Sequence, residues 1–186
     1  MDDERVKFYE EAHLYLLDDL IVLPSVTQIL EEKLFPDKYK NVPKWILKNK
    51  SKYGTKVHEL IQKYEDKEEY EIDSVYIKES FNQYLSIKEE HNIEVLSQEK
   101  IVHYKSYYAG RYDMIAYIDK EYCLVDIKTT AEVDKKYLSW QLSMYELATG
   151  LKFDKLYCLW MPKGGIVKLI EIERIEKEEI EKMLGE

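Results

Sequence analysis

Two short apolar runs separated by a polar pair open the chain. The runs 13–17 (HLYLL) and 21–24 (IVLP) flank Asp18 and Asp19. Short strands joined by a polar turn are typical of a β-hairpin. The pattern therefore predicts a hairpin ahead of the first helix.

The apolar positions then adopt helical spacing. Ser25 and Gln28 have the spacing of a capping box, which predicts a helix start at Ser25. Pro43 suits the first turn of a short second helix. Two further helices are expected over 55–64 and 74–91, because apolar side chains recur there three and four residues apart.

The segment that follows is rich in β-branched and aromatic residues. It predicts three consecutive antiparallel strands, over 94–104, 107–118 and 122–129. Turn-like breaks at Lys105-Ser106 and Asp119-Lys120 separate them.

The last third of the chain returns to mixed spacing. A helix is expected over 135–149 and is closed by Gly150. Strand-like runs at 155–161 and 166–172 follow, and a charged helix begins near Glu176. Helices, a meander, a helix and further strands predict an α+β fold, and 186 residues suit a single domain over 1–186.

The composition is that of a folded protein without a membrane-spanning segment. Hydrophobic residues make up 45% of the chain and aromatic residues 13%. No apolar run approaches the roughly 20 residues that span a bilayer. The acidic N-terminus also lacks the basic-then-apolar pattern of a signal peptide, so we expect a soluble, cytoplasmic protein.

Cys123 and Cys158 are the only cysteines, and each lies within an apolar run. This placement predicts two buried small hydrophobic residues rather than a disulfide. Two cysteines are also too few for a four-cysteine zinc site or an iron–sulfur cluster.

The net charge of −9 is unusual for a nucleic-acid-binding protein, but the charge is unevenly distributed. The segment 38–58 has no acidic residue and carries lysines at 38, 40, 44, 48, 50, 52 and 56. Tyr39, Trp45 and Tyr53 are interleaved with them. Lysines among aromatic residues favour phosphate contact with base stacking on a single strand; the alternative is a solvated helical face.

The meander contains a constellation of charged residues. If Asp119-Lys120 closes a two-residue hairpin, the numbers of facing residues add up to 239. Asp113 then faces Asp126, and the period of two places Lys128 on the same face as Asp126.

Two facing carboxylates in apolar strands repel each other unless a cation lies between them. Oxygen ligands favour Mg²⁺ or Mn²⁺, and the Ile127 carbonyl could complete the set. Lys128 could orient or help to deprotonate a water and counter the charge that develops on a phosphate. The alternative is a solvent-facing pair with Lys128 as an ordinary cross-strand partner.

Several segments together resemble one nuclease superfamily. The chain resembles the PD-(D/E)XK nucleases, and within them the RecB-type exonuclease branch that includes phage-encoded and mitochondrial-maintenance-type exonucleases. The resemblance covers about residues 20–160 and rests on the segments LPSVTQIL, GTKVHELI, GRYD, DIK and QLSMY, which occur in the expected order. Tyr112 departs from the pattern, because it stands where many members have proline.

The resemblance implies a fold and a site. It implies a restriction-endonuclease-like core over 51–175, with a central mixed sheet flanked by helices, and a hairpin and helical DNA-binding elaboration over 1–50. It implies catalytic roles or metal binding for His58, Asp113, Asp126, the Ile127 carbonyl, Lys128, Gln141 and Tyr145. The cofactor would be Mg²⁺ or Mn²⁺ without an iron–sulfur cluster.

Two further residues near this pattern carry open interpretations. Glu99 lies on the preceding strand and is either an extra carboxylate near the metal or a solvated residue paired with Lys100 or with its cross-strand neighbours. Arg111 either reaches a phosphate or braces the site. The predicted DNA-binding residues are Lys44, Trp45, Lys48, Lys52, Tyr53, Lys56 and Arg111.

The leading hypothesis is a DNA exonuclease that leaves a 5′-phosphate, in recombination, repair or phage DNA processing. One alternative is a structure-specific or nonspecific endonuclease with the same site. Another is an inactive DNA-binding subunit. Expected partners are single-stranded DNA or duplex ends, a second copy of the chain, or a separate helicase or recombination protein.

Overall fold

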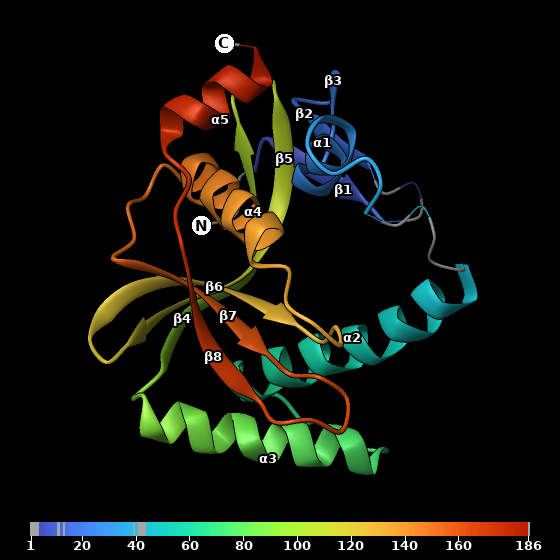
Figure 1. Ribbon diagram of the computed structural model, residues 1–186, viewed down its shortest axis with the longest axis vertical. Coiled ribbons are helices and arrows are strands. Elements are labelled where there is room, and N and C mark those ends of the chain that lie inside the picture. Colours follow the sequence, from blue (N-terminus) through green and yellow to red (C-terminus); the bar gives the residue numbers. More distant parts are fainter. Residues whose placement is uncertain (1–3, 11, 13, 39, 41–43, 186) are drawn as a thin grey trace.

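A five-stranded mixed sheet forms the centre of the fold, in the order β4-β5-β6-β7-β8 (Figure 1). The computed structural model describes residues 4–10, 12, 14–38, 40 and 44–185, and for 44–51 it describes the backbone alone. The strands are β4 (Glu94–Tyr104), β5 (Tyr108–Ile118), β6 (Glu121–Lys128), β7 (Lys155–Trp160) and β8 (Lys168–Ile172). Strands β6 and β7 are parallel, and the other neighbours are antiparallel. The predicted α+β class and antiparallel meander are confirmed.

The hairpin between β5 and β6 has the predicted register. Asp119 and Lys120 have φ angles of 50° and 73°, as the two central residues of a type I′ turn require. Five residue pairs follow, from the turn to Met114↔Val125, and each keeps the expected sum of residue numbers.

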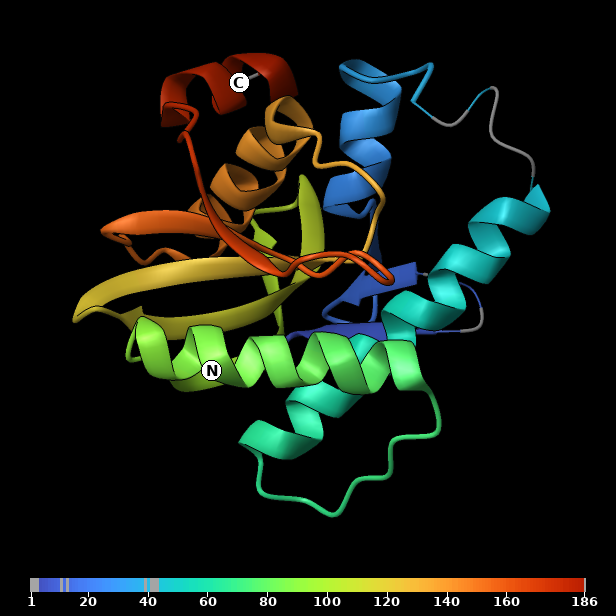
Figure 2. The same cartoon turned by 60° about the horizontal axis from the view of Figure 1, so that its bottom comes forward.

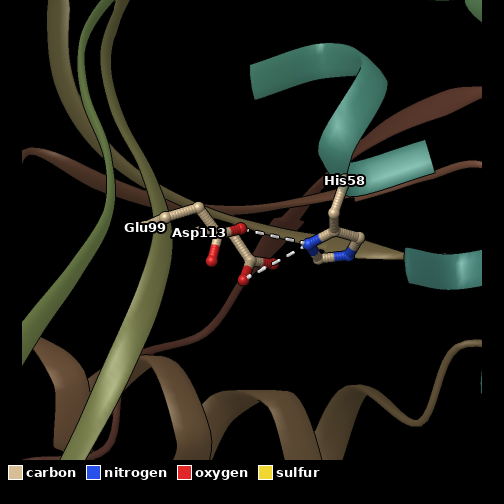
Figure 3. A group of neighbouring side chains, drawn as sticks. All are labelled: His58, Glu99 and Asp113. Carbon is tan, nitrogen blue, oxygen red and sulfur yellow. Dashed lines mark hydrogen bonds and ion pairs between the residues drawn. The ribbon is translucent and has the colours of Figure 1, made fainter. Parts of the chain in front are cut away.

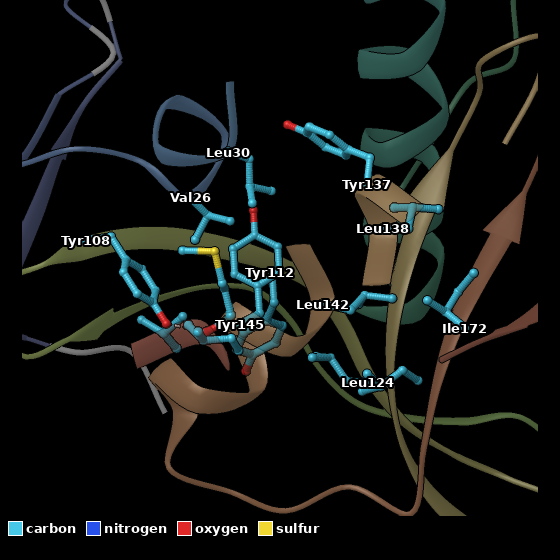
Figure 4. Packing of buried hydrophobic residues seen from close by; sticks show 14 of the residues in the cluster. Val26, Leu30, Tyr108, Tyr112, Leu124, Tyr137, Leu138, Leu142, Tyr145 and Ile172 are labelled. Carbon is cyan, nitrogen blue, oxygen red and sulfur yellow. Dashed lines mark hydrogen bonds between the residues drawn. The ribbon is translucent and has the colours of Figure 1, made fainter. Parts of the chain in front are cut away.

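Helices cover both faces of the sheet (Figures 1 and 2). Helix α1 (Val26–Lys33), α4 (Lys135–Thr149) and α5 (Lys177–Leu184) bury their apolar residues against one face. Helix α2 (Lys44–Glu65) and α3 (Val75–Glu90) bury theirs against the other. Figure 4 shows the first of these cores, in which Leu138 and Leu142 of α4 pack near Leu124 of β6.

The N-terminal residues form a separate three-stranded sheet of β1 (Val6–Tyr9), β2 (Leu14–Leu17) and β3 (Ile21–Leu23). The predicted hairpin corresponds to β2 and β3. Strand β1 was not predicted, because it is only four residues long and lies within an acidic stretch. Tyr15, Leu17 and Leu23 form a small core with Ala109 of β5. The Ala109 amide also donates to the Pro24 carbonyl at 3.0 Å, so β5 joins the two sheets.

Helix α1 begins as predicted. The Ser25 side chain accepts from the Gln28 amide, and the Gln28 side chain accepts from the Ser25 amide, so the capping box is complete. The two helices expected from Pro43 and over 55–64 are instead one helix, α2, of 22 residues. Gly54 lies within this helix, and its missing side chain serves the packing: a Cβ there would lie 3.0 Å from Thr129 Oγ1.

The remaining elements agree with the expectations. Helix α4 matches the predicted range, and Gly150 closes it with a φ of 65°. Cys123 and Cys158 are buried and free, which confirms them as small core residues. Within the described part of the chain, no helix combines the length and apolarity needed to cross a membrane.

Gly110 allows α4 to approach β5 closely. A Cβ at this position would lie 2.5 Å from Cε1 of Tyr145 and 3.2 Å from Cγ2 of Val26. Contacts this short force side chains or backbone to move, because the interior is close-packed. Gly110 therefore fixes where the Tyr145 ring lies against the sheet.

We expect Gly110→Ala to lower the free energy of unfolding by about 1–3 kcal/mol, because the added methyl overpacks this contact. Urea denaturation of the wild type and the variant measures the difference. The same substitution made in a Tyr145→Leu background should cost less, since the colliding ring is gone. An equal cost in both backgrounds would show that the ring is not the obstacle.

Candidate metal centre

Three side chains from three elements point toward one another beside the five-stranded sheet (Figure 3). His58 comes from α2, Glu99 from β4 and Asp113 from β5. His58 Nδ1 lies 3.4 Å from Glu99 Oε1 and 3.7 Å from Asp113 Oδ1. One nitrogen or oxygen from each residue can thus lie within 4.8 Å of the others, which is close enough to share an ion.

The backbone of Ile127 completes this group. His58 Nε2 lies 3.1 Å from the Ile127 carbonyl oxygen. Asp113 Oδ2 accepts a hydrogen bond from the Ile127 amide at 2.6 Å. The paired register of β5 and β6 ends at Met114↔Val125, so the direct pairing expected between Asp113 and Asp126 is replaced by this bond from side chain to backbone.

Asp126 and Lys128 form an ion pair on β6, in which Asp126 is buried and Lys128 is half-buried. Lys128 Nζ donates to Asp126 Oδ1 at 2.9 Å and lies 2.7 Å from Oδ2. Burial raises the pKa of Asp126, and the Lys128 charge opposes that rise while the Asp113 charge adds to it. Burial alone would lower the pKa of Lys128, but the carboxylates of Asp126 and Asp113 raise it, so the amine stays charged.

His58 contributes a second positive charge near the carboxylates of Asp113 and Glu99. Burial lowers its pKa, but Asp113, Glu99 and Asp126 outweigh burial and raise the pKa of His58 to about 9. A protonated imidazole here compensates a concentration of negative charge that a divalent cation could compensate instead.

Glu99 reaches this group through an unusual backbone. Its φ is 51°. Among the described residues, no other non-glycine residue within a strand has a positive φ. Such a conformation costs about 1–3 kcal/mol and persists where the surroundings hold it. Glu99 Oε2 also binds Arg111 Nε at 2.9 Å. Arg111 therefore braces Glu99, one of the two roles expected for it.

Gln141 and Tyr145 lie together on α4, as their spacing predicted. Gln141 Nε2 donates to the Tyr145 hydroxyl at 3.3 Å, and Gln141 Oε1 is buried with no hydrogen-bond partner. Burial raises the pKa of Tyr145, and the nearby charges of Asp126 and Asp113 raise it further. Tyr145 therefore stays a neutral hydroxyl beside the two aspartates.

An open cavity of about 550 Å³ lies over His58, Glu99 and Asp113. Its walls also include the N-terminus of α1, the small sheet and Tyr145. Four carboxylates, from Glu10, Glu59, Glu99 and Asp113, line it together with His58 and Arg111. Asp126 and Lys128 are not among its lining residues.

Of the predicted DNA-binding residues whose side chains the structure describes, Lys52, Tyr53 and Lys56 do not line this cavity, whereas Arg111 does. Lys52 is exposed, whereas the Tyr53 hydroxyl bonds to Ser80 Oγ at 2.9 Å and its ring packs in the core beside α3. Lys56 forms an ion pair with Asp73. Lys44, Trp45 and Lys48 lie outside the described side chains.

Other cavity residues carried no recognisable sequence signal. Phe8 and Tyr15 of the small sheet line the cavity, with Ser25 and Thr27 at the start of α1. For Ser25 the sequence predicted a helix start, through its capping box with Gln28, but no place in a cavity. Phe8 belongs to β1, the strand that was not predicted because it lies within the acidic N-terminal stretch.

No protein-family model matches the chain, and no curated protein matches it. One similar solved structure is described as "Crystal structure of SSO0001", with 19% sequence identity and a TM-score of 0.39. The match covers 57% of this chain and 54% of that one. The chain thus spans about half the length of that protein.

Proposed function

We propose that the chain is a metal-dependent deoxyribonuclease of the PD-(D/E)XK type, with a restriction-endonuclease-like core, and that it acts as an exonuclease. The observation that carries the proposal is the convergence of His58, Glu99, Asp113 and the Ile127 carbonyl beside the ion pair of Asp126 and Lys128. Five of these six groups belong to the motif segments and come from α2, β5 and β6, and the sixth, Glu99, comes from β4.

The donor set fits a hard divalent cation. Carboxylates and a backbone carbonyl outnumber the one imidazole, a combination that favours Mg²⁺ or Mn²⁺. His58, Glu99, Asp113 and the Ile127 carbonyl would hold the ion, and the Asp126 carboxylate lies on the adjoining residue. When bound, such an ion polarises a phosphate and acidifies a water molecule.

The protein's own groups have separate tasks in this scheme. Hydrolysis joins a water oxygen to phosphorus and breaks the bond from phosphorus to O3′, which leaves a 5′-phosphate. Lys128 stays charged, so it acts as a donor that counters negative charge on the phosphate rather than as a base. Asp126 holds Lys128 in place, and Arg111 holds Glu99.

The lining of the cavity explains why a metal would be needed for binding as well as for chemistry. A DNA phosphate would meet the carboxylates of Glu10, Glu59, Glu99 and Asp113. Like charges at this range repel strongly in a partly buried site. A divalent cation held by His58, Glu99 and Asp113 would offset two of these negative charges and so reduce the repulsion of a phosphate.

We expect Asp126→Asn and Lys128→Met each to abolish hydrolysis of 5′-labelled linear single-stranded DNA in Mg²⁺ or Mn²⁺, a loss of at least about 100-fold. Asp119→Asn is the matched control, because Asp119 lies at the other end of the same hairpin. The control should retain wild-type activity. Gel analysis of the labelled products measures both.

A closed circular single strand in the same assay separates the possible activities. Loss of linear DNA alone supports an exonuclease, and cutting of the circle supports the endonuclease alternative. Bound but uncut DNA under every metal would contradict a nuclease and support a binding subunit.

Metal binding can be tested without activity. We expect His58→Gln and Asp113→Asn each to weaken Mn²⁺ binding by about tenfold or more, since each removes a ligand. Electron paramagnetic resonance of free Mn²⁺ measures the affinity. His91→Gln is the control, because His91 pairs with Asp119 at 3.0 Å, away from the cavity. Equal affinities in all variants would place the ion elsewhere.

A further inference from the structure

The cavity has an aromatic wall next to its carboxylates. Phe8 of β1 and Tyr15 of β2 both line it, with ring centroids 4.6 Å apart and an interplanar angle of 33°. Arg111 connects this wall to the candidate metal centre. Its guanidinium carbon lies 5.8 Å from the centroid of Phe8, while its Nε lies 2.9 Å from Glu99 Oε2.

We infer that Phe8 and Arg111, with the buried Tyr15 ring packed against Phe8, form a subsite for one unpaired nucleobase, that of the nucleotide whose phosphate lies at His58 and Asp113. The inference rests on the proposed function and deepens it. It assigns a specificity-determining role to the small sheet and names the substrate class as single-stranded or frayed DNA.

The position of Phe8 within β1 supports this assignment. Val6 and Phe8 point to the same face of the strand, because they are two residues apart. Val6 is buried in the small core, whereas Phe8 is only partly buried and borders the cavity. The Phe8 ring therefore packs against the small core with one part and borders the cavity with another.

The chemistry of the wall matches a nucleotide better than a smaller anion. A nucleotide combines a phosphate with a flat, apolar base, and the cavity combines a candidate cation site with aromatic rings and one planar cation. Bases pack on aromatic rings and on arginine without regard to sequence. The volume of about 550 Å³ lies within the range of small-ligand sites.

The inference also restricts the state of the substrate. A base inside a duplex is already stacked and paired, and it reaches a protein ring only after it leaves the stack. The wall would therefore favour single strands over blunt duplex ends. This preference follows from Phe8 and its neighbours and not from the metal ligands.

The test measures DNA binding rather than cleavage. Fluorescence anisotropy with Ca²⁺ would compare a 5′-labelled single strand with matched strands that carry one abasic site, moved stepwise from each end. Phe8→Leu keeps apolar bulk and removes the ring, Phe8→Trp keeps a ring, and Tyr9→Ala on the exposed face of the same strand is the control. Thermal unfolding of each variant checks that it is folded.

We expect Phe8→Leu to weaken binding of the intact strand by at least about fivefold. It should have no effect when the abasic site is at the engaged nucleotide, and Phe8→Trp should restore binding. Tyr9→Ala should match the wild type. An equal loss with intact and abasic strands, or no loss, would overturn the subsite while leaving the nuclease proposal standing. Absence of any DNA binding or cleavage by the wild type would overturn both.

Discussion

Concentrated negative charge at the end of the β5–β6 hairpin is the constraint on which the rest of the molecule depends. Asp113 and Asp126 lie where the two strands stop pairing, and Glu99 adds a third carboxylate from β4. A low-dielectric sheet end cannot hold these groups without positive charge nearby. His58 from α2 and Lys128 from β6 provide this positive charge. The packing of α2 and the pairing of β6 therefore place cations next to the carboxylates.

Small residues permit the close approach of the two helices that contribute His58 and Tyr145 to the cavity. Gly54 lets α2 meet Thr129 just after β6, one turn before His58. Gly110 makes room on β5 for the Tyr145 ring of α4. In both places the absence of a side chain allows a helix to lie close to the sheet, near His58 in one case and Arg111 in the other. Glycine here acts through close contact and not through a turn.

Local rules were enough to predict much of this arrangement from the sequence. The two-residue turn Asp119-Lys120 gave the register of the hairpin, and the capping box gave the start of α1. The sequence did not predict the left-handed backbone of Glu99 or its bond to Arg111. Both depend on contacts between neighbouring strands and α2, which no periodicity encodes.

The same distinction explains the errors in the N-terminal half. Strand β1 is only four residues long and forms because β2 and β5 offer it a surface. Helix α2 continues through Gly54 because packing against Thr129 outweighs the weak helix propensity of glycine. In each case a tertiary contact overrides the local preference of a short segment.

The attachment of the small sheet has a consequence for how the molecule opens. The strands β4, β5 and β6 are neighbours along the chain, whereas the small sheet joins them through a small core that includes Ala109 and Ile101, and through the bond from Ala109 to Pro24. Contacts that close long loops form late in folding, and units held by few contacts open first. The strands β1, β2 and β3 would then behave as the least stable cooperative unit, which exchanges its amide hydrogens while the large sheet stays protected. One wall of the cavity would be gated by local unfolding rather than by a hinge.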